Sequence, residues 1–289
     1  MATGQVAAIT RWYHDHAREL PWRRPDAGAW AVLVSEFMLQ QTPVARVLPA
    51  YAAWLERWPD PPALAAAPPA DALRQWGRLG YPRRALRLHE AARIITGRHG
   101  GEVPASVADL RALPGVGAYT AAAVASFAFR QRHAVLDTNV RRVLARLYGG
   151  RELPGSAPTA AEIALAESLL PAEPALAARW SVAVMELGAL VCTAAAPRCP
   201  QCPVLAGCAW HRAGRPASPA RPRGQPYAGT DRQCRGRLLA VLRAAQEPVP
   251  RETLDRVWPD AAQRDRALAS LVTDGLAQAR PGGRYALPG

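Results

Sequence analysis

Apolar residues recur along much of the chain with the spacing of an α-helix. Between residues 5 and 19 they fall at Val6, Ile9, Trp12 and Tyr13, which places them on one face of a helix. The same period, or a long run free of glycine and proline, predicts further helices over residues 30–41, 44–58, 71–76, 118–129, 138–147 and 175–191. A Pro/Ala-rich run at residues 59–70 separates two of them.

The pattern changes after residue 210. Residues 211–230 are rich in arginine, proline and glycine and show little apolar periodicity, which is typical of a linker. Three short helical patterns follow, at residues 237–245, 251–258 and 261–275, and then a predicted hairpin at residues 276–287. This order resembles a winged helix. We therefore predict a core over residues 1–210, a linker over 211–230 and a winged-helix-like domain over 231–289, whose role in DNA contact, partner docking or packing stays open.

A tight turn precedes the helix predicted over residues 118–129. Gly115 and Gly117 flank this turn in the sequence Leu-Pro-Gly-Val-Gly. Amide N–H groups at a helix N-terminus, approached through residues without a Cβ atom, suit a phosphate oxygen and carry no information about base sequence. The alternative is a helix-turn-helix whose glycines only permit close packing.

Asp137 follows a short apolar run and precedes the helix predicted over residues 138–147. An aspartate in this position most often caps the helix, which stabilises it by about 0.5–2 kcal/mol. A capping carboxylate held by backbone amides is expected to stay ionised near neutral pH, so a capping role and a chemical role can coexist.

Glu36 is a carboxylate within an otherwise apolar helix. Val34, Phe37 and Met38 are among its neighbours in the sequence. Burial removes solvation from the charged form, so we expect the pKa of Glu36 to be raised, which suits a general acid. The alternative is an exposed glutamate on the wet face of the helix.

Composition limits the possible partners and mechanisms. The 289 residues are 49% hydrophobic and contain no apolar run long enough to span a bilayer, and residues 1–10 lack the features of a signal peptide, so we expect a cytoplasmic protein. A formal charge of +13 favours an anionic partner, and nucleic acid is favoured over a membrane surface. All 36 basic residues are arginine, which excludes a lysine Schiff base.

Two clusters of arginine recur on successive helical turns, and four cysteines lie close together. The arginines are a candidate track for the DNA backbone and comprise Arg83, Arg84, Arg87, Arg141, Arg142 and Arg146. The cysteines are Cys192, Cys199, Cys202 and Cys208. In a cytoplasmic chain such a group favours a metal over disulfides, and general rules leave both zinc and an iron–sulfur cluster open. Cys234 is expected to be an ordinary free thiol.

Three motifs resemble the helix-hairpin-helix base-excision glycosylases, which cut N-glycosidic bonds in DNA. Leu-Pro-Gly-Val-Gly-x-x-Thr-Ala is followed by Leu-Asp-x-Asn-Val within residues 113–140. Ser-Glu-Phe-Met-Leu-Gln-Gln-Thr at 35–42 and Leu-Pro-Trp-Arg at 20–23 resemble segments of the MutY-type adenine glycosylases. The resemblance covers residues 9–210 and implies an all-α core of two helical lobes.

The resemblance implies a role for each matching residue. Glu36 would protonate adenine, and Asp137 would stabilise positive charge on the deoxyribose, with Tyr119 and Asn139 as further members of the catalytic site. The expected pocket and duplex-insertion residues are Leu20, Arg23, Gln40, Gln41 and Tyr81, and the expected phosphate-binding residues are Gly115 and Gly117. Two positions depart from the family pattern, because Pro82 replaces a second tyrosine and Val182 stands where relatives tend to have glutamate or glutamine.

The resemblance also implies a cofactor and a type of reaction. The spacing Cys-x6-Cys-x2-Cys-x5-Cys is similar to the loop that holds a [4Fe-4S] cluster in endonuclease III and MutY proteins. Tyr119 stands where family members that also cleave the DNA backbone carry a lysine, which implies a monofunctional enzyme. We also expect the Nudix-related domain, with which many MutY proteins inspect 8-oxoguanine, to be missing, because the C-terminal tail is short.

We therefore expect a monomeric enzyme that acts on double-stranded DNA. The expected reaction is hydrolysis of the N-glycosidic bond of adenine mispaired with 8-oxoguanine or guanine. Three alternatives stay open: a bifunctional glycosylase-lyase for damaged pyrimidines, a glycosylase for another purine lesion, and a non-catalytic iron–sulfur regulator that binds DNA. The absence of lysine argues against the first, and the two carboxylates argue against the last.

Overall fold

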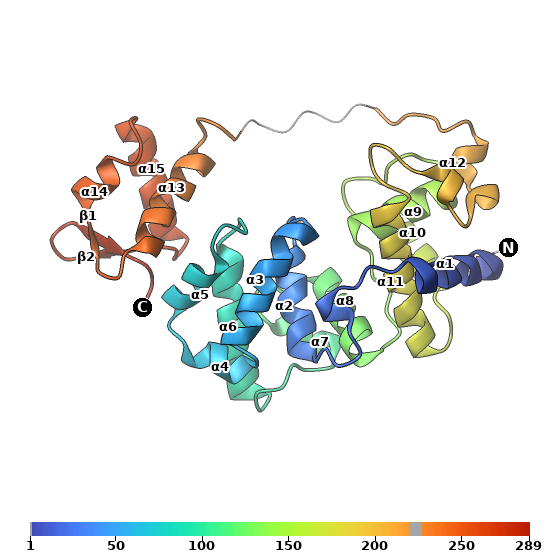
Figure 1. Ribbon diagram of the computed structural model, residues 1–289, viewed down its shortest axis with the longest axis horizontal. Helices are drawn as coiled ribbons and strands as arrows, with labels where there is room; N and C mark the ends of the chain where they lie inside the picture. The colour runs from blue at the N-terminus through green and yellow to red at the C-terminus, as the bar shows by residue number, and fades with distance from the viewer. Residues whose placement is uncertain (1, 220–226) are drawn as a thin grey trace. The chain divides into compact units, whose positions relative to one another are not determined.

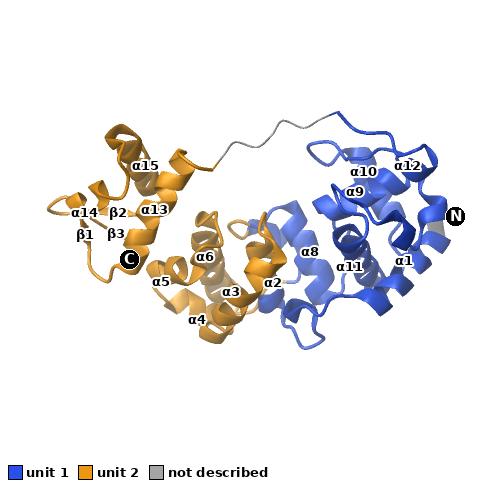
Figure 2. Cartoon of the chain, turned by 45° about the horizontal axis from the view of Figure 1, so that its top comes forward, with its two compact units in different colours: residues 1–33, 105–112, 116–221 blue, residues 34–104, 113–115, 222–289 orange. Residues whose placement is uncertain are grey.

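The protein is described here by a computed structural model that covers residues 2–219 and 227–289, with only the backbone of residues 2 and 3. The fold is mostly helical, as the sequence predicts, and its few strands lie near the C-terminus (Figure 1). The chain divides into two compact units, one of residues 1–33, 105–112 and 116–221 and the other of residues 34–104, 113–115 and 222–289 (Figure 2). We call them unit 1 and unit 2.

Unit 1 is a helical bundle that brings the N-terminal helix onto helices from the second half of the chain. Its apolar core includes Ile9, Trp12, Leu144, Trp180 and Leu187. Its elements are α1 (Ala2–His16), η1 (Pro21–Arg23), α7 (Val107–Ala112), α8 (Ala118–Phe129), α9 (Thr138–Leu147), α10 (Ala160–Ser168), α11 (Pro174–Leu190), η2 (Cys199–Gln201), η3 (Leu205–Gly207) and α12 (Ala209–Arg212). The bounds predicted for α8 and α9 are confirmed.

Unit 2 contains the middle helices. They are α2 (Ala29–Leu39), whose first turns belong to unit 1, α3 (Val44–Arg57), α4 (Pro61–Ala66), α5 (Pro69–Trp76) and α6 (Arg83–Arg98). The Pro/Ala-rich run was wrongly expected to be only a separator, because it forms α4. Asp60 accepts a hydrogen bond from the amide of Ala63 (2.8 Å), and Pro61 occupies the first helical position, where its missing N–H costs nothing.

The C-terminal residues of unit 2 form three helices and a small sheet. The order is α13 (Asp231–Ala244), β1 (Val249–Pro250), α14 (Arg251–Asp255), α15 (Ala261–Thr273), β2 (Gln278–Arg280) and β3 (Arg284–Ala286). The sheet is antiparallel in the order β1-β3-β2, and β2 pairs with β3 through Ala279 opposite Tyr285. The predicted sequence of helices followed by a hairpin is confirmed, and β1 is a strand that the pattern did not reveal. Residues 220–226 of the predicted linker lie outside the described residues.

The C-terminal helices contact the rest of unit 2 through arginines. Arg74 of α5 donates to the carbonyl oxygen of Ala245 (3.2 Å), and Arg243 of α13 donates to that of Gly77. Arg83 of α6 forms an ion pair with Asp274 (3.3 Å). Within the described part of the chain, no helix has the length and apolar character needed to cross a membrane.

Candidate functional site

Glu36 lies in α2, one of the most apolar helices of the chain. Its residue is 6% exposed, and the following Phe37 and Met38 are fully buried. Glu36 is therefore buried, as the argument for a general acid requires. The alternative of an exposed glutamate on the wet face of the helix is wrong.

Gly115 packs tightly against the helix that carries Glu36. Its φ is +84°, and a Cβ atom added there would lie 2.8 Å from Cε1 of Phe37 and 3.0 Å from Cβ of Arg87. Gly117 is different, since its φ is −89° and a Cβ atom would meet nothing within 4 Å. The close-packing interpretation therefore holds for Gly115, while Gly117 leaves open space at the N-terminus of α8.

Replacing each of these two glycines by alanine should show that Gly115, and not Gly117, is needed for close packing. We expect Gly115→Ala to lower the free energy of unfolding by roughly 2 kcal/mol or more, because it adds a left-handed strain and a steric overlap. Gly117→Ala is the matched control and should change it by less than about 0.5 kcal/mol. Urea unfolding of both variants measures this, and equal values would contradict the packing argument.

Arg84 of α6 organises the turn that follows α2. This buried guanidinium donates to the carbonyl oxygens of Phe37 (2.8 Å) and Met38 (3.2 Å) and to that of Gln40. Carbonyl groups in the last turn of a helix lack partners within the helix, and a guanidinium can satisfy several at once. The turn ends at Gln41, which is exposed and has a φ of +54°. Arg84 therefore fixes the backbone of the two glutamines expected to enter the duplex.

The same arginine holds the segment that carries Tyr81. Arg84 donates to the carbonyl oxygen of Gly80 (3.1 Å), which also accepts from Nε1 of Trp76 (2.9 Å). The guanidinium carbon lies 5.3 Å from the centre of the Tyr81 ring, and Tyr81 is 50% exposed with a φ of +47°. Burial lowers the pKa of Arg84 to about 10, which the charge of Tyr81 opposes. Arg84 thus holds both segments that are expected to enter the duplex.

The predicted arginine track is wrong for four of its six members. Arg84, Arg141, Arg142 and Arg146 are at most 7% exposed and point to main-chain carbonyl groups and carboxylates. Arg146, for example, donates to the carbonyl oxygens of Thr193 (2.7 Å) and Glu152 (2.9 Å). Only Arg83 and Arg87 are exposed.

Asp137 is the N-cap of α9, as the sequence predicts. Its Oδ1 accepts from the amide of Val140 (2.6 Å), and its Oδ2 accepts from Nδ2 of Asn139 (2.7 Å). Burial raises the pKa of the Asp137 carboxyl, against the lowering effect of these hydrogen bonds and of the charge of Arg142. The sequence argument considered only the capping hydrogen bonds, whereas burial has the larger effect on the pKa of Asp137.

Asn139 links Asp137 to the end of α11. Its Oδ1 accepts from Arg142 (2.8 Å), which also donates to the carbonyl oxygens of Gly188 (2.7 Å) and Cys192 (2.7 Å). A Cβ atom at Gly188 would lie 2.8 Å from Cβ of Asn139, so α9 and α11 approach closely at this point. Tyr119 lies half-buried in the first turn of α8, and Val182 is half-buried on α11.

Glu186 of α11 is a charged residue of the site that the sequence argument missed. It is fully buried, and its carboxylate accepts from Nε (2.7 Å), Nη2 (2.8 Å) and the backbone amide (3.0 Å) of Arg18. Arg23 forms an ion pair with it at 2.9 Å. Leu20 and Trp22 lie between these arginines and are buried, so the predicted pocket segment is held to α11. The missed signal was a lone carboxylate within an apolar helix, the same that identified Glu36.

Glu186 should make stability depend on acidity. Burial alone would raise its pKa, but the hydrogen bonds from Arg18 and the charge of Arg23 outweigh this effect and lower the pKa to about 2. A depressed carboxyl pKa stabilises the fold above its unfolded value of 4.5, and this contribution, roughly 3 kcal/mol, is lost as the pH falls from 4.5 to about 2. Glu186→Gln should flatten that part of the curve of unfolding free energy against pH, whereas the exposed Glu167→Gln should not. A parallel shift for both variants would contradict the argument.

The four clustered cysteines follow α11 in one half-buried loop and are all free thiols. Burial raises the pKa of Cys202 to about 11, and the thiols of Cys192, Cys208 and Cys199 add to that rise. Nη1 of Arg146 lies 3.4 Å from Sγ of Cys192. Even so, among the described residues no three His, Cys, Asp or Glu side chains are gathered closely enough to bind a metal ion.

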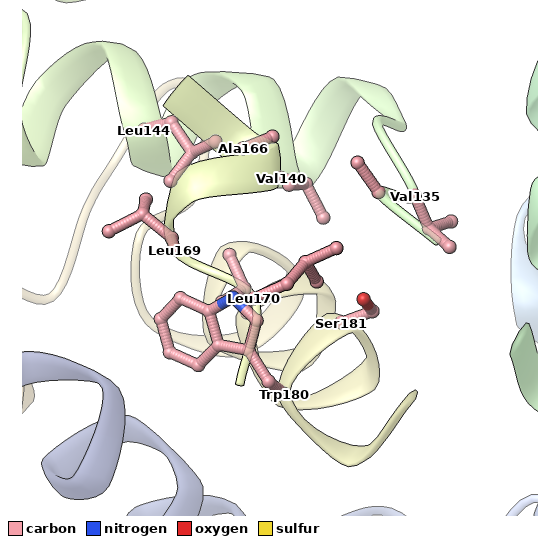
Figure 3. A pocket seen from close by; sticks show the side chains of 10 residues that line it. Val135, Val140, Leu144, Ala166, Leu169, Leu170, Trp180 and Ser181 are labelled. Atoms are coloured by element: carbon pink, nitrogen blue, oxygen red, sulfur yellow. The ribbon is translucent and has the colours of Figure 1, made fainter. Parts of the chain in front are cut away.

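A small apolar cavity lies within unit 1 (Figure 3). Leu144 of α9, Ala166 of α10 and Trp180 of α11 line it, and Ser181 adds one hydroxyl group. It has room for a single water-sized molecule, far less than a purine base needs. This cavity is therefore a packing gap and not a base pocket.

The fold and the site define a class of protein. Helices α7 and α8 pack together within unit 1 on either side of the glycine turn, which makes a helix-hairpin-helix, and α9 follows with Asp137 at its N-terminus. A mostly helical chain with this hairpin, the capping aspartate and a buried glutamate in an apolar helix has the features of the helix-hairpin-helix glycosylases.

Comparisons with known proteins agree with this class. The profile of the HhH-GPD superfamily base excision DNA repair proteins matches residues 34–168. An adenine DNA glycosylase of Mycobacterium tuberculosis is 56% identical, over 97% of this chain and 92% of that protein, and one of Mycolicibacterium smegmatis is 54% identical, over 97% and 95%. The solved structure of a thermostable thymine-DNA glycosylase has a TM-score of 0.66 at 26% identity, and the match covers 73% of this chain and 97% of that one. The chain belongs to the adenine DNA glycosylase family within this superfamily.

Proposed function

We propose that this protein is a monofunctional DNA glycosylase that hydrolyses the N-glycosidic bond of adenine mispaired with 8-oxoguanine or guanine. The observation that carries the proposal is Glu36, a buried carboxylate at the family's acid position in α2. Membership of the adenine DNA glycosylase family supports adenine in double-stranded DNA as the substrate. A monomer acting at the nucleoid in the cytoplasm is the setting that fits this role.

In the proposed reaction the two carboxylates divide the work. Glu36 gives a proton to the purine, so that the C–N bond breaks with a neutral base as the leaving group. Ionised Asp137 stabilises the positive charge that develops on the deoxyribose, and water adds to the sugar carbon with loss of a proton. Asn139 donates to Oδ2 of Asp137, while the amide of Val140 donates to Oδ1.

The sequence limits how the reaction ends. A lyase step needs an amine that forms a Schiff base with the sugar, and the chain contains no lysine. We expect an abasic site as the product. The backbone amides near Gly117 would hold a phosphate, while Gln40, Gln41 and Tyr81 would enter the duplex beside the extruded base.

Single-turnover cleavage of defined duplexes tests the proposal. Adenine is placed opposite 8-oxoguanine, guanine or thymine, and each product is assayed with and without hot alkali. We expect release opposite 8-oxoguanine and guanine, with strand breaks only after alkali. Strand breaks without alkali would overturn the monofunctional assignment, and equally slow release from all three duplexes would overturn the mispair assignment. Release of another purine would instead point to the departures at Pro82 and Val182.

We also propose that Cys192, Cys199, Cys202 and Cys208 hold a [4Fe-4S] cluster. The donor set would be four free, half-buried thiols in one loop, which this structure does not gather into a metal site, and Arg146 beside Cys192 provides positive charge for a thiolate. When bound, the cluster would cross-link the loop of residues 192–208. Protein purified without oxygen should contain about four irons per chain. Cys199→Ser should lose them, and Cys234→Ser, the control in α13, should not. Zinc in place of iron would overturn the proposal.

A further inference from the structure

Residues 77–82 form the turn between α5 and α6 that carries Tyr81, and we call them the Tyr81 turn. Its backbone is unusual, because φ is +53° at Gly77, +85° at Gly80 and +47° at Tyr81. A positive φ is unfavourable for a residue with a side chain and persists only where the surrounding structure holds it. The Tyr81 residue itself is 50% exposed. The position of its ring therefore depends on the contacts that hold the backbone of the turn.

Every carbonyl oxygen of the Tyr81 turn accepts a hydrogen bond. Those of residues 78–82 accept from the side chains of Arg46, Thr42, Trp76 and Arg84 and from the amides of Arg84 and Ala85. The carbonyl oxygen of Gly77 accepts from Nη1 of Arg243, which belongs to α13. Burial lowers the pKa of Arg243 to about 10, which leaves it charged at neutral pH, and a charged donor makes a strong hydrogen bond. The C-terminal helices thus complete the set of donors to the turn.

The C-terminal helices also contact the chain at the other end of the Tyr81 turn. Arg83 follows the turn directly and forms an ion pair with Asp274 (3.3 Å). Asp274 is held in place by a second ion pair, with Arg235 of α13 (2.6 Å). Helix α13 packs against α5 within unit 2 (Figure 2). Arg243 and Asp274 therefore bracket the turn from one side.

We infer that Arg243 is a positioning residue that, together with Asp274, holds the Tyr81 turn so that the Tyr81 ring is presented to the duplex. The inference rests on the proposed function, in which this ring enters the duplex beside the extruded base. Arg243 contacts the backbone of the turn and acts only through Tyr81. The winged-helix-like domain thereby contributes to base extrusion from a distance.

Arg74 separates this role from the simple attachment of one part of unit 2 to another. It donates from α5 to the carbonyl oxygen of Ala245 (3.2 Å), at the end of α13, and it pairs with Asp71 (3.0 Å). Arg74 thus joins the same two helices as Arg243 does, but its acceptor lies outside the Tyr81 turn. It is the matched control, because it is the same type of residue at the same contact between helices.

A double-mutant cycle in the full-length enzyme tests the inference. The variants are Arg243→Gln, Tyr81→Ala, the double variant and Arg74→Gln. Each is assayed for single-turnover release of adenine opposite 8-oxoguanine. Each is also assayed for the fluorescence of a 2-aminopurine placed beside that adenine, which rises when the bases unstack. Melting temperatures are measured alongside, because a loss of stability alone would lower them without any dependence on Tyr81.

The expected effects follow from a role exerted through one ring. Tyr81→Ala should slow release by about tenfold or more, as loss of an aromatic stack on a base does. Arg243→Gln should slow release by about fivefold through misplacement of that ring. In the Tyr81→Ala background the same substitution should slow release by less than about twofold, since the ring through which it acts is gone. Arg74→Gln should stay within about twofold of the wild type. The fluorescence rise should diminish in the same order.

Each outcome bears on one claim. If the wild-type enzyme releases no adenine, the proposed function fails, and the fluorescence cycle still decides the role of Arg243. The positioning role is overturned if the effects of Arg243→Gln and Tyr81→Ala multiply in the double variant. It is also overturned if Arg243→Gln behaves as the wild type, or if Arg74→Gln is as slow as Arg243→Gln. Should Arg243→Gln not fold, Asp274→Asn takes its place, since it keeps the shape of the side chain but loses the charge that attracts Arg83.

Discussion

Glu36→Gln is expected to abolish measurable base release while the enzyme still binds its duplex. The amide has nearly the shape of the carboxyl group but cannot supply the proton that makes the purine a good leaving group. Loss of a general acid costs about 10²–10⁴-fold in rate. Duplex affinity should change little, because Glu36 is buried in α2 and the surface that meets the DNA backbone is untouched.

The measurement is a single-turnover time course on adenine opposite 8-oxoguanine, with duplex affinity determined separately. Glu56→Gln, an exposed glutamate on α3, is the control and should behave as the wild type. A Glu36→Gln enzyme that releases adenine at the wild-type rate would show that the proton comes from another group.

Asp137→Asn should slow base release by about 10²–10³-fold without unfolding the protein. Asparagine is as good an N-cap as aspartate, so the hydrogen bond to Val140 and the start of α9 should survive. The variant loses the negative charge that is proposed to stabilise the sugar cation. Because burial raises the pKa of Asp137, wild-type release should decline on the acid side at a higher pH than for an exposed aspartate, and the variant should lack this dependence.

The control for Asp137 is another capping aspartate. Asp260 caps α15 through the amide of Gln263 (2.9 Å) and has no proposed chemical role. Asp260→Asn should leave both the rate and the melting temperature near the wild type. If Asp137→Asn lowers the melting temperature by several degrees while Asp260→Asn does not, the rate loss would reflect damage to α9 instead of a missing charge.

The helices and the residues at their ends were predictable because they depend on local chemistry. A run of alanines free of glycine and proline fixed α8, and an aspartate before Thr138 marked the start of α9. The elements of the winged-helix-like domain could be read in order for the same reason. Strand β1 escaped because it has only two residues, too few for any alternation.

The interior of the site was not predictable, because it depends on partners far apart in the chain. Arg84 and Arg142 look like surface residues in the sequence, and only the fold brings unpaired carbonyl groups of other elements to them. Glu36 and Glu186 carry the same local signal, a carboxylate in an apolar helix. Two arginines pair with Glu186, and nothing within four residues of it indicates those partners.

The inward-facing arginines also change how strongly the protein should respond to salt. A formal charge of +13 counts Arg84, Arg141, Arg142 and Arg146, yet these guanidinium groups are buried among main-chain oxygens and carboxylates. Counterion release on binding DNA depends only on the cations that reach phosphates. Each of these cations contributes about 0.9 to the steepness of log affinity against log salt concentration. The affinity for DNA should therefore fall less steeply with rising salt concentration than the total number of basic side chains suggests.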